Sequence, residues 1–166
     1  MKVIMDQGQI SRTLKRMTHE IIERNANLKD LVLVGIKQKG VPVAKRLVEN
    51  LKRFSDVDVP LFELDITNHR DDDKKTDKQT LTSKTDLTQK NVIIVDDVLF
   101  TGRSVRAAMD AITDLGRPSK IQLAILIDRG HRELPIRADY IGKNIPTSYL
   151  EKVIVDWDER VYIISA

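Results

Sequence analysis

The fold is decided by one stretch of the sequence, Val92-Ile93-Ile94-Val95-Asp96-Asp97-Val98-Leu99-Phe100-Thr101-Gly102-Arg103-Ser104. Its aliphatic start predicts a strand that is buried on both faces of a sheet. Asp96 and Asp97 follow directly, so we expect two carboxylates where that strand ends. The small residues from Thr101 to Ser104 allow backbone N–H groups to surround a phosphate at the start of a helix, where the helix dipole favours an anion. The stretch therefore predicts a strand, a phosphate-binding loop and a helix.

The same order of strand, loop and helix recurs along the chain. An apolar run at 31–36 is followed by apolar residues at helical spacing from Val41 to Leu51, and the strand at 92–95 is followed by a second helical stripe that Gly116 and Pro118 end. A further strand is expected at 121–127, and an amphipathic helix at 9–25. This alternation predicts an α/β fold with a doubly wound, mostly parallel sheet, whose ligands bind at the carboxyl ends of the strands.

The length of 166 residues favours one domain over the whole chain, 1–166. Within it, the polar and charged residues of 67–90 are expected to form a flexible lid loop. Short apolar runs at 138–142, 152–155 and 161–164 predict strands, either at the sheet edge or in a small cap or hood.

The composition excludes several classes of site. There is no cysteine, which removes disulfides, thiolate metal sites and cysteine nucleophiles. The net charge of +3 is modest, so the placement of the charges matters more than their sum. No apolar run is long enough to span a membrane, and we expect a cytoplasmic protein without membrane partners.

Two familiar nucleotide-binding motifs are absent from the sequence. Gly35 and Gly40 have the spacing of P-loop glycines, but Val41 and Pro42 stand where Lys and Ser or Thr are required. No Gly-x-Gly-x-x-Gly motif follows a strand, which disfavours a dinucleotide fold. The loop from Gly35 to Gly40, with its two lysines, instead fits a second anion-binding loop.

The first motif resembles the phosphoribosyl pyrophosphate (PRPP) loop of type I phosphoribosyltransferases, and the Gly35–Gly40 loop resembles their pyrophosphate loop. A longer segment, from Asp128 to Ser148, resembles the signature of the PyrR family of bifunctional pyrimidine regulators. Together with His19–Asn25 and the loop at Arg70, the resemblance extends to about Val155. It implies a type I phosphoribosyltransferase fold with a hood.

The resemblance also implies two activities. The first is transfer of phosphoribose from PRPP to uracil, giving UMP and pyrophosphate. The second is binding to the leader of pyrimidine-operon messenger RNA under the control of UMP or UTP, which promotes transcription attenuation.

By the same resemblance, Asp96 and Asp97 hold the ribose hydroxyls and Arg70 joins them as a catalytic residue of the lid. Mg²⁺ is expected as the cofactor, bound mainly through the substrate, with the two aspartates as its candidate protein ligands. Base contacts are expected near Ile127 to Arg129. The PRPP- and nucleotide-binding residues are expected to be Lys37, Gln38, Lys39, Gly40, Asp96, Asp97, Val98, Leu99, Phe100, Thr101, Gly102, Arg103 and Ser104.

The family binds RNA on a basic concave surface and forms homodimers, which pair into tetramers. The matching RNA-binding candidates are Arg16, His19, Arg24, His131, Arg132, Arg137 and Lys143. A solvated charged face or internal salt bridges would explain the same residues singly. Gathered together on a chain of low net charge, they predict a localised patch.

The sequence departs from the family pattern at three places. Gln38-Lys39 replaces the usual Thr-Arg, Lys15 replaces a frequent Thr, and Asn68-His69 replaces the common Leu-Tyr. A lysine keeps the charge of arginine but lacks its planar fork.

Two alternatives to the bifunctional reading remain at this stage. One is an RNA-binding nucleotide sensor with little catalysis. The other is a phosphoribosyltransferase for a purine or orotate without a role in RNA binding, because the central motif reports only on the sugar-phosphate half of the substrate.

Overall fold

The computed structural model of the chain describes residues 1–66, 81–82, 84–156 and 160–165. Its main element is a five-stranded parallel sheet in the order β3-β2-β4-β5-β6. The strands are β2 (Leu31–Ile36), β3 (Leu61–Leu64), β4 (Asn91–Leu99), β5 (Lys120–Asp128) and β6 (Tyr140–Asn144). The predicted parallel α/β sheet is thus confirmed.

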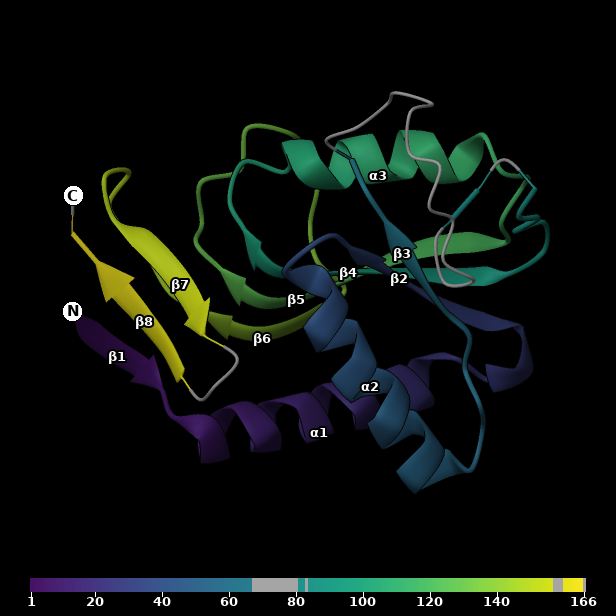
Figure 1. Cartoon of the computed structure of the whole chain (residues 1–166), viewed down its shortest axis with the longest axis horizontal. Helices are drawn as coiled ribbons and strands as arrows, with labels where there is room; N and C mark the ends of the chain where they lie inside the picture. Colours follow the sequence, from purple (N-terminus) through teal and green to yellow (C-terminus); the bar gives the residue numbers. More distant parts are fainter. Residues whose placement is uncertain (67–80, 83, 157–159, 166) are drawn as a thin grey trace.

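Three helices cover the two faces of this sheet (Figure 1). Helices α1 (Gln7–Arg24) and α2 (Gly40–Ser55) lie on one face, and α3 (Arg103–Thr113) lies on the other. The helix α1 begins two residues before the predicted start because Asp6 and Gln9 form a capping box, in which each side chain accepts a hydrogen bond from the other residue's backbone. The short η1 (Leu28–Asp30) leads into β2.

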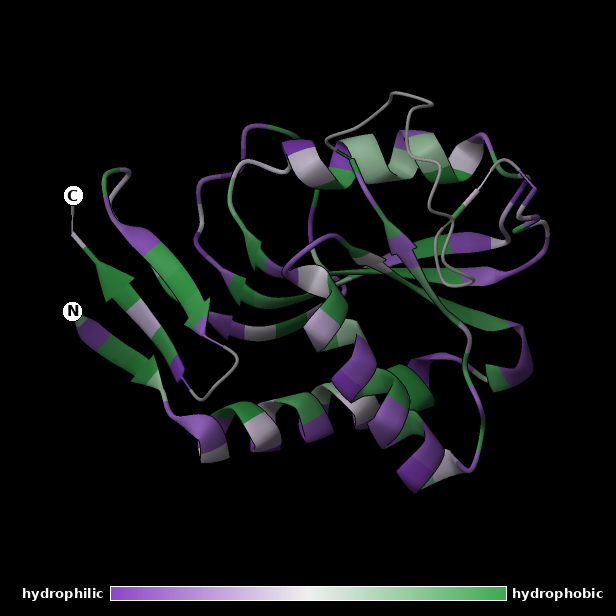
Figure 2. Ribbon diagram, in the orientation of Figure 1, coloured by the Kyte–Doolittle hydropathy of each residue, from purple (hydrophilic) through white to green (hydrophobic). Residues whose placement is uncertain are grey.

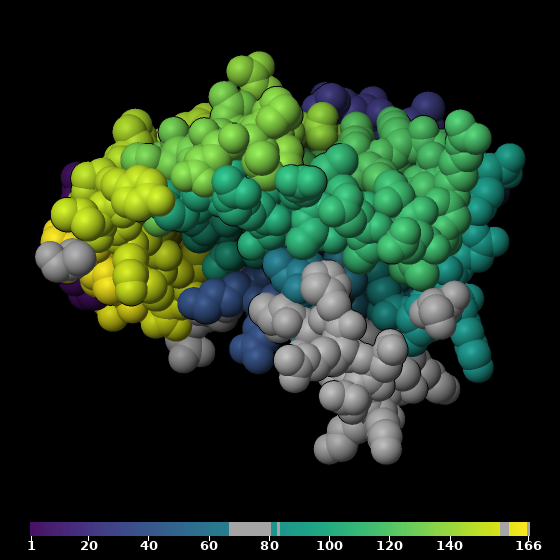
Figure 3. All heavy atoms as spheres, turned by 90° about the horizontal axis from the view of Figure 1, so that it is seen from above, coloured from purple at the N-terminus to yellow at the C-terminus, as the bar shows by residue number. Residues whose placement is uncertain are grey.

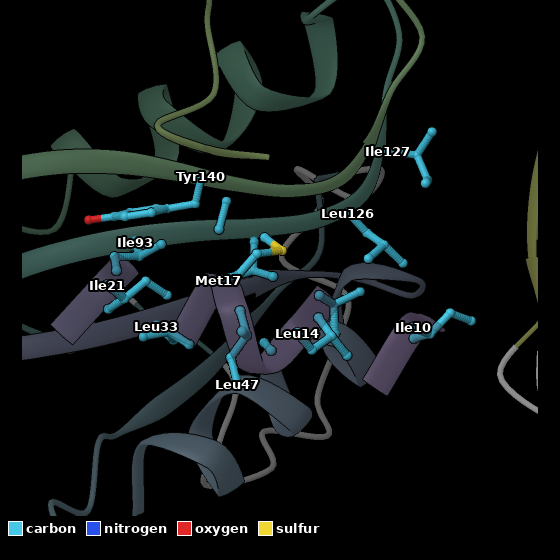
Figure 4. Close-up of a cluster of buried hydrophobic side chains, with 14 of the residues drawn as sticks. Ile10, Leu14, Met17, Ile21, Leu33, Leu47, Ile93, Leu126, Ile127 and Tyr140 are labelled. Atoms are coloured by element: carbon cyan, nitrogen blue, oxygen red, sulfur yellow. The ribbon is translucent and has the colours of Figure 1, made fainter. Parts of the chain in front are cut away.

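The apolar stripes of these helices fill two cores, one on each side of the sheet. Figure 2 shows the strands as largely hydrophobic and the helices as two-sided. On the α1–α2 side, Leu14, Met17 and Ile21 pack with Leu47 against β4 and β5, as Figure 4 shows. On the other side, Val105, Ala108 and Ile112 of α3 are buried. The helical periodicity therefore predicted the buried faces correctly.

A separate three-stranded sheet forms the hood, in the order β1-β8-β7. Its strands are β1 (Lys2–Met5), β7 (Lys152–Asp156) and β8 (Arg160–Ile164), and both pairings are antiparallel. The hood lies at the end of the molecule toward which β5 and β6 point (Figure 1). The first of the three predicted C-terminal runs, at 138–142, forms β6 at the edge of the main sheet, and the other two form β7 and β8 of the hood. Both predicted alternatives therefore occur. The N-terminal strand β1 was not predicted.

The predicted lid at 67–90 is only partly within the described residues, since 67–80 and 83 lie outside them. Its carboxyl end is fixed to the body, because Leu87 is buried and its N–H donates to the Leu115 carbonyl at 2.9 Å. The N–H of Gln89 likewise donates to the Arg117 carbonyl. These contacts hold Leu87 and Gln89 against the body of the fold, and the lid at 67–90 stays a prediction. No helix among the described residues is long and apolar enough to cross a membrane.

Candidate active site and basic surface

The predicted phosphate-binding loop, called the phosphate loop below, spans residues 100–104 between β4 and α3. Gly102 caps α3 with a φ of 94°, a backbone conformation that glycine adopts without strain. The N–H of Arg106 bonds to the Gly102 carbonyl at 3.0 Å, so the amides of the first helical turn before it point out of the helix. This arrangement suits a bound phosphate, as the sequence predicted.

The two aspartates lie inside β4 and not after it, because the strand continues to Leu99. The predicted strand end at 95 was therefore wrong. Backbone amides bind both carboxylates: the Asp97 N–H donates to Asp96 Oδ1 at 2.9 Å, and the Val98 N–H donates to Asp97 Oδ1 at 2.7 Å. These bonds fix the two side chains at the carboxyl end of the strand.

Burial and charge repulsion change the protonation of the aspartate pair. Loss of hydration, followed by repulsion from Asp97, raises the pKa of Asp96 from its usual 3.8 to about 8. Asp97 itself is only 7% exposed. Asp96 is therefore largely protonated near neutral pH, which lowers the negative charge at this point of the strand.

The second anion-binding loop lies directly against the first aspartate. A Cβ added to Gly40 would overlap the Val95 carbonyl oxygen and lie 3.0 Å from the Asp96 Cα, so only glycine allows this approach. Helix α2 begins there without a side-chain cap on its N-terminus. A cavity of about 410 Å³ is lined by Lys37, Gln38, Lys39 and Asp65. The structure thus brings the predicted second loop against Asp96 of the first motif.

A cluster of aromatic rings around a buried arginine borders the phosphate loop. The guanidinium of Arg129 lies 4.0 Å from the centre of the Phe100 ring, and it donates to Thr147 Oγ1 at 3.1 Å and to the Ser148 carbonyl at 3.2 Å. Tyr149, which is 63% exposed, lies 5.3 Å from Phe100 between ring centres. Burial lowers the pKa of Arg129.

Arg129 was only loosely predicted, as a neighbour of the base. Nothing in the sequence indicated its bonds to residues 147 and 148, because they depend on the path of a loop.

Two of the basic RNA-binding candidates close the free edge of β6. Arg16 donates through Nη2 to the carbonyls of Ile141 and Gly142, at 3.1 and 2.6 Å. Arg24 donates to the Asp139 carbonyl at 2.9 Å. These bonds satisfy backbone groups that an edge strand leaves open. The two arginines therefore have a structural role in addition to any role in binding.

Three other candidates line a cavity of about 560 Å³ beside β6, namely His131, Arg132 and Arg137. Its wall includes Ile141, which also lines the smaller cavity that contains Arg16 and Arg24. The two groups of basic residues thus border one another. Lys143 lies on β6, exposed, whereas the ring of His19 packs 4.6 Å from that of Phe54 on α2 and lies outside both cavities. Most of the predicted surface is contiguous.

The described residues contain no group of three or more metal-ligating side chains. The aspartate pair nevertheless fits Mg²⁺ that is bound mainly through its substrate, because magnesium commonly takes one or two carboxylates together with phosphate oxygens and water. The predicted catalytic residue Arg70 lies outside the described residues, as do Asn68 and His69.

Comparisons with known proteins identify the fold and the relatives of this chain. The family model described as a phosphoribosyl transferase domain matches residues 2–160. A protein of Enterococcus faecalis named bifunctional protein pyrR is 57% identical over 162 residues, covering 96% of this chain and 91% of the relative. The bifunctional protein PyrR of Bacillus pumilus is 58% identical over 163 residues, with coverage of 95% and 91%.

Solved structures give the same fold at low sequence identity. The hypoxanthine phosphoribosyltransferase of Trypanosoma cruzi matches with a TM-score of 0.77 and 20% identity, covering 99% of this chain and 97% of that one. A hypoxanthine-guanine phosphoribosyltransferase of Bacillus anthracis matches with a TM-score of 0.67 and 19% identity, over 88% and 82% of the two chains. These two neighbours bear on the fold alone.

Proposed function

We propose a function from the premise that this chain belongs to the phosphoribosyl transferase family and, within it, to the bifunctional PyrR proteins. The chain is a uracil phosphoribosyltransferase, which makes UMP and pyrophosphate from uracil and PRPP. It is also a regulator of pyrimidine biosynthesis, which binds leader messenger RNA when a uridine nucleotide is present. The observation that carries the enzymatic half is the approach of the Lys37–Gly40 loop to Asp96, beside the phosphate loop at Thr101–Ser104.

Each of these elements has a separate task in the transfer. The amides at Thr101–Ser104 hold the 5′-phosphate of PRPP, and Asp96 and Asp97 accept hydrogen bonds from the ribose hydroxyls. The Lys37–Gly40 loop holds the pyrophosphate, so that the ribose C1 lies between the two loops. Asp96 and Asp97 are the protein groups that would hold Mg²⁺, which would supply positive charge to the leaving pyrophosphate. Fixing the sugar in this way can lower the barrier by about 7–11 kcal/mol once uracil N1 is aligned with C1.

The charge of the aspartate pair favours the transition state. Positive charge develops on the ribose as the bond to pyrophosphate breaks, and nearby carboxylates stabilise it. We assign Arg70 and the lid at residues 67–90 the task of covering the pyrophosphate, which keeps water from the activated sugar. We assign base contacts to the region around Arg129, Phe100 and Tyr149, which lies next to the phosphate loop.

The regulatory half uses the basic surface beside β6. Arg132, Arg137 and Lys143 are exposed there and suit RNA phosphates, while Arg16 and Arg24 flank them across Ile141. The proposed RNA is a hairpin with unpaired bases, because such regions carry most sequence-specific recognition of RNA. We further propose a cytoplasmic homodimer, which pairs into a tetramer, with the whole chain as one domain.

The test measures UMP formation and binding of leader RNA on one preparation. Free uracil, orotate, hypoxanthine and guanine are each offered with PRPP and Mg²⁺, and the RNA complex is measured with and without UMP. We expect product from uracil and tighter binding of leader RNA than of a scrambled RNA when UMP is present. Product from a purine or orotate in place of uracil would contradict the assigned substrate. Equal affinity for the two RNAs would contradict the regulatory role.

A further inference from the structure

The segment Arg129–Arg137 lies between the phosphate loop and the basic cavity, and it contacts both. On one side, the Glu133 N–H donates to the Thr101 carbonyl at 2.9 Å, and its carboxylate Oε1 accepts from Arg103 Nε at 3.1 Å. The side chains of Leu134 and Ile136 lie next to Gly102. The segment is therefore fixed to the loop that receives the phosphate.

On its other side, the same segment forms a wall of the basic cavity with His131, Arg132 and Arg137. The ring of His131 lies 5.3 Å from that of Phe100 and its Nε2 is 2.6 Å from the Thr147 carbonyl oxygen, so this wall also touches the phosphate loop. Figure 3 shows the segment, in light green, side by side with the darker green residues of α3. One short stretch of chain thus forms part of both sites.

A phosphate in the loop would change the balance of charges at this contact. Arg103 is the first residue of α3, and its bond to Glu133 is solvent-exposed, with side-chain exposures of 64% and 40%. Exposed ion pairs of this kind are weak, whereas arginine binds phosphate through strong charge-assisted hydrogen bonds. A nucleotide phosphate therefore competes with Glu133 for Arg103 and repels the Glu133 carboxylate.

We propose that the Arg103–Glu133 contact couples the nucleotide site to RNA binding, with Glu133 as the residue that transmits phosphate occupancy to the basic wall at 131–137. This inference rests on the proposed function and adds to it a physical route for nucleotide control. Release of Glu133 shifts the wall and, with it, the exposed cations that meet RNA. Such a coupling is reciprocal, so bound RNA raises the affinity for UMP by the same factor.

The substitution Glu133→Gln tests this link, because it removes the charge and keeps the size of an exposed side chain. The affinity for leader RNA is measured without UMP and at saturating UMP, and the ratio of the two affinities gives the coupling. Typical couplings of this kind are about 5–150-fold. We expect the ratio in the variant to be at least threefold smaller than in the unmodified protein, mainly because RNA binds more tightly without UMP. A smaller decrease would overturn the link.

The matched control is Glu20→Gln, which removes the acid of another exposed Arg–Glu pair. Glu20 bonds to Arg16 at 3.0 Å on the same basic surface, and among the described residues its hydrogen bonds do not reach the phosphate loop. Glu20→Gln should change the RNA affinity by the same factor with and without UMP. If it reduces the coupling as much as Glu133→Gln does, the specific role of Glu133 is overturned. If UMP does not change the RNA affinity of the unmodified protein, the proposed function itself is contradicted.

Discussion

The sugar-phosphate site and the basic surface are built in opposite ways. The first comes from two short loops, each contiguous in the sequence and each at the carboxyl end of a central strand. The second is assembled from α1 and the segment after β5, which are more than a hundred residues apart and meet at the edge strand β6. Residues within one contiguous loop are free to act in binding and catalysis only. Residues that connect distant segments, such as Arg16, also stabilise the fold.

The largest expected effect concerns the buried carboxylate of the sugar-phosphate site. Asp97→Asn removes a negative charge beside the ribose, and we expect kcat/KM for UMP formation to fall by about 100-fold or more. The measurement is steady-state turnover of uracil with PRPP. Asp110→Asn, on the exposed side of α3, is the control and should retain full activity. Unchanged turnover in Asp97→Asn would contradict the site.

The close approach of the Lys37–Gly40 loop to Asp96 can be broken at Gly40. Gly40→Ala places a methyl group against the Val95 carbonyl, which pushes the pyrophosphate loop away from Asp96. We expect a loss of about 1–3 kcal/mol in the free energy of unfolding and a rise of about tenfold or more in the KM for PRPP. Urea unfolding and initial rates measure the two effects.

Gly8→Ala is the control for Gly40→Ala, because its methyl group meets nothing closer than 3.3 Å and α1 tolerates alanine. If both variants bind PRPP as the unmodified protein does, the pyrophosphate loop does not require this contact.

Arg16 is expected both to bind RNA and to stabilise the fold, whereas Arg137 is expected only to bind RNA. Arg16→Ala should lose RNA affinity and also about 1 kcal/mol of stability, because two carbonyls of β6 lose their donor. Arg137→Ala should lower the RNA affinity without lowering the stability of the protein. The slope of log RNA affinity against log salt concentration should become smaller by about one. RNA titrations at several salt concentrations and thermal unfolding check both. If the two variants are equally stable, Arg16 has no structural role that Arg137 lacks.

A last prediction concerns the pH dependence that Asp96 gives to stability. Its pKa is about 8 in the folded chain and near 3.8 in the unfolded one, so stability is fully present below pH 3.8 and is lost as the pH rises to 8. Asp96→Asn removes that loss, so the free energy of unfolding should decrease less between pH 5 and pH 8 in the variant than in the unmodified protein. Urea unfolding at pH 5 and pH 8 measures it. A variant with the same pH dependence as the unmodified protein would show that Asp96 is not the cause.

Much of the fold could be predicted because it follows from local patterns. Buried strands such as Leu31–Ile36 are continuous apolar runs, and helices such as α2 carry a stripe at helical spacing. The strand β1 was missed because it has only four residues and pairs with β8 at the other end of the chain. Pairing over such a separation leaves no local signal.

The features of the site were likewise predicted only where the sequence carries a local signal. The phosphate loop was predicted because its glycine and the following helix start are neighbours in the sequence. The Arg103–Glu133 contact was not predicted, because it joins two loops whose paths depend on the whole fold. His19 was predicted to share the basic surface, but it packs against Phe54, since residues on one helix point to different neighbours.

The central claim is that one chain carries a transfer site and a distinct RNA surface. The most direct test measures UMP formation and leader-RNA affinity together, in unmodified protein and in Arg137→Ala. We predict that both proteins convert uracil and PRPP to UMP at the same rate, while the variant binds RNA about five- to tenfold more weakly, as expected for the loss of one charged contact worth about 1–1.4 kcal/mol. A parallel loss of both activities, or RNA affinity that the substitution leaves unchanged, would contradict the claim.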